Sequence, residues 1–467
     1  MNLQTNLFEH QRPAVEKLKA SRVGGLFMEM GTGKSRAAIE LVHLRRQRID
    51  KVIWFCPVSL KETIRYEIGK HTDCRDVCVF DDNTRQRTLP QARWYIVGIE
   101  SMSSSDRTVL AVNRLMTSRT FVIVDESSYI KGHNSRRTRR ITRISQKARY
   151  RLILTGTPMS QGVVDLYAQM YFLSPKILGY SSFYSFAANH LEYSEKYPGM
   201  IVRAHHTGWL AAKIQPYIYQ VTKEEAGLRL PPKLYEGRYF LMTSEQAEWY
   251  YQAKVELLLD LPDEEIDSIA IFRLFTALQQ IVSGFWNRGG ELITFPHHRL
   301  EQLLTVVAGL DETEKVVIWC KYRTSIEQIA AALRVEYGAE AVALFYGDLS
   351  ERERNAEIER FRGGPARFLL ATQASGGHGL DLTVARYVIF YENEFKYANR
   401  IQAEDRCHRI GQERRVTYID IGCVGSIDDR IAKALATKGD AVRAFREQVE
   451  KVKRADRAEL KRLVMDL

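Results

Sequence analysis

The stretch GGLFMEMGTGKSRAAIELVHLRRQRIDKVIWFCP, residues 24–57, decides the fold class. It runs from an apolar segment through a glycine-rich loop into helical spacing and ends in a short apolar strand. Further apolar runs, at 95–99, 121–126 and 151–158, end in polar or glycine residues. Buried runs separated by helical patterns predict a parallel sheet covered by helices on both faces.

The second half of the chain repeats this rhythm. Its apolar runs lie at 315–320, 341–347, 367–372, 387–392 and 416–421. We therefore predict an α/β fold with two parallel-sheet lobes and, between them, an aromatic-rich segment with helical patterns. The predicted domains are a first lobe at 1–170, a mostly helical insertion and linker at 171–295, a second lobe at 296–435 and a C-terminal helical tail at 436–467.

The composition is that of a globular protein with a basic surface. Of 467 residues, 45% are hydrophobic and 27% charged, and the formal net charge is +11 with a pI of about 9.2. A basic excess favours nucleic acid as a partner first and an anionic membrane second. No apolar run approaches the length of a membrane span, and the charged N-terminus has no apolar signal core, so we expect no membrane association. Six thinly spread cysteines favour a reducing compartment.

The segment GTGKS, residues 31–35, has the composition of a phosphate-binding loop. It follows a predicted strand and opens a predicted helix, which lets glycines bring backbone amides close to phosphate oxygens. Lys34 would neutralise the β- and γ-phosphates, and the Ser35 hydroxyl would bind Mg²⁺. Met28 stands where the full pattern has its first glycine. The alternative is a glycine turn followed by a chance Lys-Ser pair.

The segment FVIVDESS, residues 121–128, places two carboxylates at the end of a predicted strand, where α/β proteins bind ligands. Asp125 would hold Mg²⁺, directly or through water, and Glu126 would orient and deprotonate an attacking water. The alternative, a carboxylate pair that caps a helix, is common for one such motif alone. It does not account for both motifs in this order in one half of the chain.

The segment QAEDRCHRIGQ, residues 402–412, carries two arginines three residues apart. This spacing would put Arg406 and Arg409 on one side of a helix, aimed at a negative charge, with Gln402 one turn earlier. Cys407 and His408 could instead form a thiol nucleophile or a metal site. Adjacent side chains on a helix diverge, which disfavours that pairing.

A second cluster of metal-ligand residue types lies in HTDCRDVC, residues 71–78. It contains His71, Cys74 and Cys78. A structural zinc needs four ligands, and no second pair lies at a suitable spacing. We therefore predict metal binding by Ser35 and Asp125 alone.

In chain order, these and further motifs resemble a Swi/Snf-type ATPase of helicase superfamily two. In the first half the resemblance rests on FEHQRPAVEKL, MEMGTGKS, FCPVSLKETIRYEI, DESSYIK and LILTGTPMSQ. In the second half it rests on VVIWCKYRTSIEQI, YGDLSERERNAEIERF, ATQASGGHGLDLTVARYVIFYENE, QAEDRCHRIGQ and GSIDDRIAKAL. The motifs span about residues 8–435, and the chain resembles compact bacterial or viral members.

The resemblance implies two RecA-like lobes with ATP and Mg²⁺ in the cleft between them, and sequence-independent binding of double-stranded DNA across both lobes. It implies translocation on DNA without strand separation, in the cytoplasm of a bacterial or virus-infected cell or in a eukaryotic nucleus. By this resemblance, Arg406, Arg409 and Gln402 join Glu126 as catalytic residues when the lobes close on ATP. The implied ATP-binding residues are Gln11, Gly31, Thr32, Gly33, Lys34 and Ser35, and the implied coupling residues are Thr155, Gly156 and Thr157.

DNA contacts are expected from cations, hydroxyls and backbone amides, because tracking phosphates needs no groups that read bases. By family position these are Ser59, Lys61, Lys321, Arg323, Arg354, Thr372 and a glycine turn with Gly376, Gly377 and Gly379. The dense basic run SRRTRR, residues 135–140, is either a loop of the first lobe that touches DNA or a solvated helix face.

The sequence departs from the family pattern at two places. Ser128 replaces the usual histidine after Asp-Glu-x, and FKYAN at 395–399 lacks the usual Trp-Asn-Pro. The alternatives are a strand-separating DNA or RNA helicase, an ATP-gated DNA-binding switch that does not move, and the motor subunit of a restriction or defence complex. Strand displacement on a forked duplex and DNA-stimulated ATPase turnover would separate the first two from a translocase.

Overall fold

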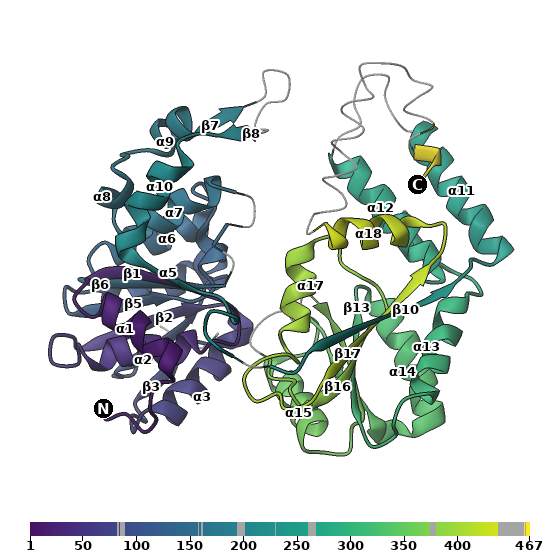
Figure 1. Cartoon of the computed structure of the whole chain (residues 1–467), viewed down its shortest axis with the longest axis horizontal. Helices are drawn as coiled ribbons and strands as arrows, with labels where there is room; N and C mark the ends of the chain where they lie inside the picture. Colours follow the sequence, from purple (N-terminus) through teal and green to yellow (C-terminus); the bar gives the residue numbers. More distant parts are fainter. Residues whose placement is uncertain are drawn as a thin grey trace. The chain divides into compact units, whose positions relative to one another are not determined.

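The computed structural model describes the chain except residues 82–83, 85–88, 157, 160–161, 194–200, 229, 260–267, 374–379, 438–461 and 463. The chain divides into two compact units, Met1–Arg229 and Leu230–Leu467. Each unit is built on one large parallel sheet, which confirms the predicted α/β class (Figure 1). In the described parts of the chain, no helix combines the length and the apolar character that crossing a membrane requires.

The first unit holds a seven-stranded sheet in the order β3-β4-β2-β5-β6-β1-β9, with every neighbouring pair parallel. Its strands are β1 (Val23–Met28), β2 (Lys51–Cys56), β3 (Val77–Val79), β4 (Trp94–Gly98), β5 (Thr120–Val124), β6 (Tyr150–Thr155) and β9 (Ile218–Val221). The three apolar runs and the strand before the glycine-rich loop are therefore all strands, as predicted.

Helices cover both faces of this sheet. Along β2, Val52 and Trp54 pack with α1 (Arg12–Leu18), α2 (Lys34–His43) and α3 (Lys61–His71). Ile53 and Phe55 point the other way. They pack with a second group of helices, α4 (Ser101–Ser104), α5 (Asp106–Leu115), α6 (Arg136–Ser145), α7 (Val164–Leu173), α8 (Pro175–Leu178), α9 (Phe183–His190) and α10 (Thr207–Ile214). Because both faces are buried, the central strands read as continuous apolar runs. A short hairpin of β7 (Leu191–Tyr193) and β8 (Ile201–Ala204) follows α9.

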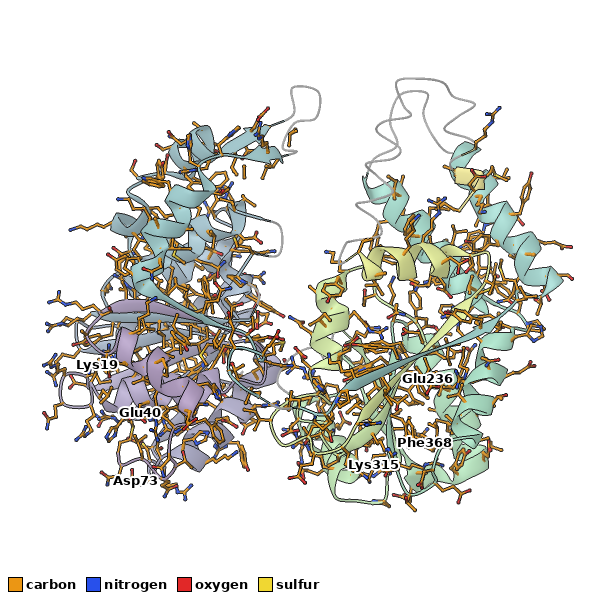
Figure 2. The ribbon with its side chains drawn as sticks, in the orientation of Figure 1. Lys19, Glu40, Asp73, Glu236, Lys315 and Phe368 are labelled. Carbon is orange, nitrogen blue, oxygen red and sulfur yellow. The ribbon has the colours of Figure 1, made fainter. Side chains whose placement is uncertain are left out.

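The second unit holds a six-stranded parallel sheet in the order β10-β17-β16-β13-β15-β14. Its strands are β10 (Lys233–Phe240), β13 (Lys315–Cys320), β14 (Val342–Phe345), β15 (Phe368–Thr372), β16 (Ala385–Phe390) and β17 (Val416–Cys423). Lys315 and Phe368, labelled in Figure 2, mark the starts of β13 and β15, where Val316 is level with Phe368. The Lys315 ammonium donates to the carbonyls of Gly364 and Ala366.

The helices of the second unit pack on its sheet and on one another. They are α11 (Ser244–Leu259), α12 (Ser268–Val282), α13 (His298–Ala308), α14 (Arg323–Tyr337), α15 (Glu351–Arg362), α17 (Tyr397–Glu404) and α18 (Ile427–Ala436), with a hairpin of β11 (Phe285–Arg288) and β12 (Glu291–Thr294). Val316 and Ile318 of β13 face one core, and Val317 and Trp319 face the other.

Residues 171–295, expected to form one helical insertion and linker, are divided between the two units. β9 joins the first sheet beside β1, and β10 joins the second sheet beside β17. Neither strand has a strong apolar run, because both lie at sheet edges and β10 is mostly exposed. Most of the predicted tail, 436–467, lies outside the described residues, but Val464 and Leu467 are buried in the core of the second unit.

Candidate active site

The glycine-rich loop lies between β1 and α2, as its sequence predicts. Gly31 and Gly33 have φ values of 82° and 81°, in the left-handed region that favours glycine. Gly33 is the N-cap of α2, so the backbone N–H groups of the first helical turn are available to an anion. Met28 is the buried last residue of β1 and lies outside the turn, so this position needs no glycine.

Lys34 is already held over the loop. Its ammonium donates to the carbonyls of Met28, at 2.8 Å, and Glu29, at 3.3 Å. The Thr32 hydroxyl donates to the Glu29 carbonyl at 2.7 Å. The loop therefore surrounds a cation at the start of a helix, which is the arrangement that a phosphate chain requires.

Gln11 braces the same loop from the N-terminal side. Its side chain is 1% exposed and its amide N–H groups point at the carbonyls of Thr32 and Gly33, at 3.3 and 3.4 Å. Its amide oxygen accepts from the Phe8 backbone at 3.0 Å. A Cβ added at Gly33 would lie 2.1 Å from Nε2 of Gln11, so this contact also requires the glycine. The role of Gln11 toward adenine stays a prediction.

Asp125 and Glu126 follow the end of β5 directly. Asp125 is buried, its Oδ1 accepts from the Glu126 N–H at 2.9 Å, and burial raises its pKa to about 6, opposed by the charge of Lys34. Glu126 has a φ of 49°, a conformation that is costly for a residue with a side chain. Backbone strain of this kind persists only where the surrounding structure enforces it. The left-handed backbone at Glu126 turns the chain just after the end of β5.

The carboxylate of Glu126 is held by two hydroxyls. Its Oε1 accepts from the Ser128 hydroxyl at 2.8 Å and from the Thr155 hydroxyl at 3.3 Å. Ser128, which replaces the family's usual histidine, therefore contacts the predicted base directly. Thr155 is the buried last residue of β6, so the predicted coupling segment touches the predicted catalytic residue.

The neighbouring coupling residues are less fully described. A Cβ added at Gly156 would lie 3.3 Å from the Met30 backbone nitrogen, so this segment runs close against the glycine-rich loop. Thr157 lies outside the described residues.

A buried polar link beside this site was not predicted from the sequence. The Ser127 hydroxyl donates to Oε1 of Gln169 at 2.6 Å, and Nε2 of Gln169 donates to the carbonyls of Pro158 and Asp165, both at 2.8 Å. Ser127 and Gln169 are both fully buried. They join the Asp-Glu segment to α7 and to the segment after β6. A glutamine inside the apolar run DLYAQMYFL is the one signal that could have pointed to it.

The residues present fit ATP with Mg²⁺. The donor set at the loop supplies backbone N–H groups and the Lys34 ammonium for phosphate oxygens. Ser35 in the first turn of α2 and Asp125 offer the oxygen ligands that Mg²⁺ prefers. Among the described residues, no group of three or more His, Cys, Asp or Glu side chains is placed to hold a metal. At the other cluster of interest, both ring nitrogens of His71 contact protein groups, Thr5 and Glu67.

In the second unit, the prediction that Arg406 and Arg409 share a helix face is wrong. α17 ends at Glu404, and both arginines lie in the turn that follows. The Arg406 carbonyl accepts from the Leu382 N–H at 3.0 Å, so it is not available to continue the helix. The Gln412 amide donates to the Cys407 carbonyl at 3.0 Å and closes the turn.

The turn places the two arginines in different environments. Arg406 is buried, whereas Arg409 is half-buried and donates to the Leu380 carbonyl at 3.4 Å. Gln402 lies in α17 and is half-buried. The predicted action of these three residues on phosphate stays a prediction.

Cys407 and His408 serve the turn. Cys407 is fully buried, and burial raises the pKa of its thiol, which disfavours the thiolate that a nucleophile needs. The His408 ring contacts the Pro231 carbonyl through Nε2 at 2.7 Å. Both side chains therefore pack within their own unit.

The predicted DNA-contact residues differ in how they are presented. Lys61 is buried and donates to the Phe80 carbonyl at 3.0 Å. The Lys321 ammonium donates to Gln279 at 2.8 Å and lies 3.0 Å from the centre of the Phe395 ring. Burial lowers the Lys321 pKa to about 7. Both cations are engaged inside the protein, and whether either reaches phosphate stays a prediction.

The remaining predicted contacts are more accessible. Arg323 is exposed and pairs with Glu327 and Asp348. Arg354, at 5.9 Å from the centre of the Phe345 ring, Ser59 and Thr372 are half-buried. Gly376, Gly377 and Gly379 lie outside the described residues. The basic run at 135–140 is not a loop, because Ser135 caps α6 and Arg136 begins it.

Two protein-family models match successive parts of the chain. The SNF2-related domain matches residues 10–284, and the helicase conserved C-terminal domain matches residues 298–411. The chain is 28% identical over 330 residues to the putative ATP-dependent helicase/translocase YwqA of Bacillus subtilis, covering 68% of this chain and 34% of that protein. It is 23% identical over 454 residues to the uncharacterized ATP-dependent helicase MG018 of Mycoplasma genitalium, covering 95% of this chain and 42% of that protein.

Among solved structures, the chain is similar to the Sulfolobus solfataricus SWI2/SNF2 ATPase core in complex with dsDNA. The TM-score is 0.45 with 23% identity, over 99% of this chain and 97% of that one. The chain spans 34% and 42% of the lengths of the two bacterial relatives. The SNF2-related domain alone covers more than half of this chain and contains both the phosphate loop and the Asp-Glu pair. The chain therefore belongs to the SNF2-related family, in which the two bacterial relatives are named as ATP-dependent helicases.

Proposed function

We propose that this chain is a DNA-stimulated ATPase that translocates on double-stranded DNA without separating the strands and so remodels DNA or protein–DNA complexes. The observation that carries the proposal is the contact of Glu126 with Thr155 beside the phosphate loop. It links the group that would activate water to the segment that would sense DNA. The name of the Bacillus subtilis relative, a putative ATP-dependent helicase/translocase, supports ATP-driven movement.

The chemistry follows from the side chains of the first unit. The backbone N–H groups at the start of α2 and the Lys34 ammonium bind and orient the phosphate chain. Ser35 and Asp125 would hold Mg²⁺, which supplies positive charge to the phosphate oxygens when bound. Glu126 accepts the proton of the attacking water, and the hydroxyls of Ser128 and Thr155 fix the orientation of its carboxylate.

Arg406 and Arg409 are proposed to stabilise the charge that develops on the transferred phosphate. An arginine in this role is typically worth about 10³–10⁵ in rate. Arg406→Ala and Arg409→Ala are therefore expected to bind ATP and DNA within severalfold of the wild type while losing DNA-stimulated turnover. Cys407→Ser, which changes a buried neighbour in the same turn, is the matched control and should keep most activity. Active arginine variants with an inactive Cys407→Ser would overturn this assignment.

The binding of duplex DNA is proposed to depend on phosphates and not on base sequence. Each neutralised phosphate contributes about −0.9 to the slope of log K against log salt for duplex DNA. Affinity should therefore fall at least tenfold between roughly 50 and 200 mM salt, and equally for duplexes of different sequence. Affinity that does not change with salt, or a strong preference for one sequence, would contradict this part of the proposal.

The deciding experiment measures steady-state ATPase rates with no nucleic acid, single-stranded DNA, double-stranded DNA and RNA. Strand displacement is followed in parallel on a forked duplex, and displacement of a third strand from duplex DNA reports translocation. Stimulation by the duplex together with third-strand displacement, and without fork opening, supports the proposal. Fork opening would identify a strand-separating helicase, and duplex binding without stimulated turnover would identify a static ATP-gated switch.

A further inference from the structure

The arginines of α6 do not act as one basic surface, although they are consecutive in the sequence. Arg136 and Arg140 both pair with Asp106. Arg137 donates to the Tyr129 carbonyl at 2.8 Å and lies 5.3 Å from the centre of the Tyr129 ring. Three of the arginines in and after SRRTRR are therefore engaged by groups of the first unit.

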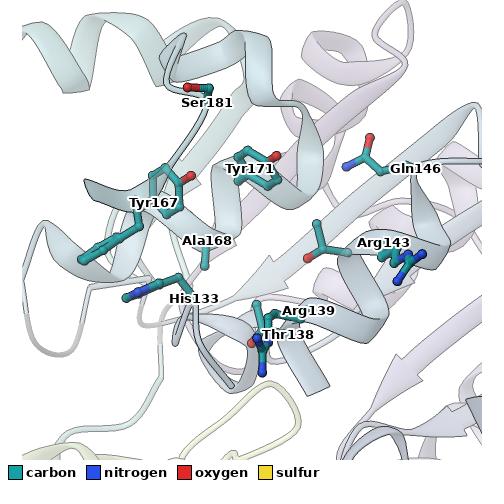
Figure 3. A pocket seen from close by; sticks show the side chains of 11 residues that line it. His133, Thr138, Arg139, Arg143, Gln146, Tyr167, Ala168, Tyr171 and Ser181 are labelled. Carbon is teal, nitrogen blue, oxygen red and sulfur yellow. The ribbon is translucent and has the colours of Figure 1, made fainter. Parts of the chain in front are cut away.

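Arg139 and Arg143 lie one helical turn apart on α6 and are both exposed. Within the described part of the chain, neither forms an ion pair. Both line a cavity of about 530 Å³ between α6, α7 and the segment that leads into α9 (Figure 3). No aspartate or glutamate is among the described residues that line it, so the rim carries uncompensated positive charge. This volume lies in the range of small-molecule sites.

The side of the cavity opposite α6 is aromatic. Tyr167 and Tyr171, one turn apart on α7, lie across the cavity from Arg143 and Gln146 in Figure 3. His133 and Phe183 also line it, stacked on each other with ring centres 3.6 Å apart and an interplanar angle of 12°. Flat aromatic walls of this kind suit a planar ring that stacks.

A buried hydroxyl gives a second, independent sign that the cavity is built for a ligand. Thr142, between the two arginines on α6, lines the cavity and is 8% exposed. Its Oγ1 has no hydrogen-bond partner among the described residues. The neighbouring Thr138 hydroxyl is already engaged by Ser135 at 2.6 Å. A buried polar atom without a partner is costly, and a ligand with a polar edge would satisfy it.

We propose that this cavity binds a nucleoside phosphate. The phosphate lies on Arg139 and Arg143, the base stacks against the aromatic side that includes Tyr171, and the Thr142 hydroxyl bonds to a polar atom of the base or sugar. Guanidinium groups one turn apart suit a phosphate, and base–aromatic stacking tolerates any base. The cavity shares no residue with the phosphate loop at 31–35.

Two ligands contain a nucleoside phosphate that could enter the cavity: a free nucleotide and an unpaired nucleotide at the end of a DNA strand. A paired base within a duplex is enclosed by its neighbours and cannot enter a cavity. An acidic peptide with an apolar anchor would also meet the arginines, but its anchor would leave the Thr142 hydroxyl without a partner. The nucleoside phosphate is therefore favoured over the peptide.

The test uses the full chain with Lys34→Ala in every sample, so that binding at the phosphate loop is weakened throughout. Binding of labelled AMP is measured by equilibrium dialysis. Binding of a blunt duplex and of the same duplex with one unpaired nucleotide is measured by fluorescence anisotropy. Arg139→Gln with Arg143→Gln removes the phosphate contacts. Arg136→Gln with Arg149→Gln removes the same charge at two other exposed arginines of the first unit and is the matched control.

The expected result is that the Arg139/Arg143 double variant weakens probe binding at least about tenfold while the control double variant binds within twofold of the parent, because only the former removes charge-assisted contacts. Thr142→Val should weaken the same probe severalfold, with Thr142→Ser restoring it. If the Arg139/Arg143 double variant loses AMP binding, the ligand is a free nucleotide. If the parent protein binds the overhang duplex more tightly than the blunt duplex and the double variant does not, the ligand is an unpaired nucleotide at a strand end.

Equal binding by the two double variants, or no binding of either probe, overturns the proposal. A third outcome also overturns it. In that outcome an acidic, tryptophan-containing peptide binds the parent protein but not the Arg139/Arg143 variant, and the binding of both nucleotide probes is unchanged. Thermal unfolding of each variant tests whether it is folded. If a variant unfolds at the same temperature as the parent but does not bind the probe, the lost binding is due to the changed cavity.

Discussion

The two units place carboxylates at the ends of comparable strands but surround them differently. Asp125 and Glu126 follow β5, which lies between β2 and β6, and Glu392 follows β16 by two residues, between β13 and β17. Asp125 and Glu392 are both buried. The sequences FVIVDE and YVIFYE look alike, so the pattern alone does not distinguish a reactive carboxylate from a structural one.

The neighbours of Glu392 are protein groups fixed in place. Its Oε2 accepts from the Lys321 N–H at 2.9 Å and its Oε1 from the Ser325 hydroxyl at 2.5 Å. Burial raises its pKa, and the charge of Arg299 acts against that rise. Arg299 itself is fully buried and pairs with Asp428. The second unit therefore uses its carboxylate to tie strands and helices together.

Asp125 instead lies within electrostatic reach of the glycine-rich loop, because the charge of Lys34 is what chiefly opposes the rise of its pKa. The contacts to Glu126 come from neutral hydroxyls, which orient a carboxylate without neutralising it. We infer that the partners of a strand-end carboxylate, and not the strand itself, decide whether the carboxylate is available to a ligand or ties the fold together.

The largest effect expected from the difference between the two carboxylate sites is on catalysis, in Glu126→Gln. Removing a general base typically costs about 10²–10⁴ in rate. Binding of ATP should persist, because Lys34, Ser35 and Asp125 are unchanged. Single-turnover cleavage of ATP and equilibrium binding of a nucleotide separate the two effects. Ser128→Ala is the control, since it keeps the carboxylate and removes one orienting hydroxyl, and it should slow cleavage by severalfold only. Wild-type cleavage by Glu126→Gln would show that Glu126 is not the base.

In the second unit, the corresponding change should act on stability. Arg299→Met leaves Glu392 as a buried charge and Asp428 as a partly buried charge without their cation, and breaking a buried pair in this way costs about 3–5 kcal/mol. The free energy of unfolding of the full chain in urea measures the loss. Arg323→Met is the matched control, because its pairs with Glu327 and Asp348 are exposed and such pairs are worth about 0–1 kcal/mol. Equal losses in the two variants would refute the comparison.

Strands buried on both faces could be predicted because their apolar runs do not depend on the rest of the fold. The glycines at 31 and 33 could be predicted for a similar reason, since the loop needs left-handed backbone there. The edge strands β9 and β10 could not, because an edge strand half-exposed to solvent carries little apolar signal.

Side-chain partners from distant segments were the least predictable part of the site. The spacing of Arg406 and Arg409 predicts a helix, but the Arg406 carbonyl accepts from the Leu382 N–H. The Gln412 side chain, which closes the turn, also donates to the Thr383 carbonyl, so a distant segment holds the turn in place. The link between Ser127 and Gln169 spans 42 positions in the sequence. A local pattern does not contain such information.

A pH dependence should mark the first carboxylate pair. Burial raises the pKa of Asp125 from its ordinary 3.8 to about 6. Because the folded value is the higher one, this group favours the folded protein at low pH, and that contribution is lost as the pH rises through about 6. A cation that binds Asp125 must displace its proton below pH 6, so the affinity for Mg²⁺ with nucleotide should fall about tenfold for each pH unit there.

Isothermal titration of Mg²⁺ with ADP between pH 5 and 8 measures this dependence. Asp125→Asn is the control, because an amide has no proton to displace, so its weaker binding should change across the same range only as the phosphate of ADP itself titrates. A wild-type affinity that stays constant between pH 5 and 6 would mean that Asp125 does not contact the cation or does not titrate there.

The smallest expected effect concerns the link of Ser127 to Gln169. This link holds the Asp-Glu segment of the first unit by neutral hydrogen bonds, whereas the second unit holds Glu392 and Asp428 beside the charge of Arg299. A neutral hydrogen bond contributes about 0.5–1.5 kcal/mol, and each single change strands a buried partner. Ser127→Ala leaves the Gln169 oxygen without this donor. Gln169→Leu leaves the Ser127 hydroxyl without this acceptor and the Pro158 carbonyl without this donor. The double variant should therefore lose less than the sum of the single losses, by about 1 kcal/mol in the free energy of unfolding.

The same four proteins are compared for ATP turnover. If the link positions the Asp-Glu segment, kcat falls in each variant while the KM for ATP changes little, because Lys34 and the loop still bind the phosphates. Additive losses in stability, with unchanged kcat, would show that the two side chains are not coupled in stability and that the contact does not orient the predicted catalytic carboxylate of Glu126.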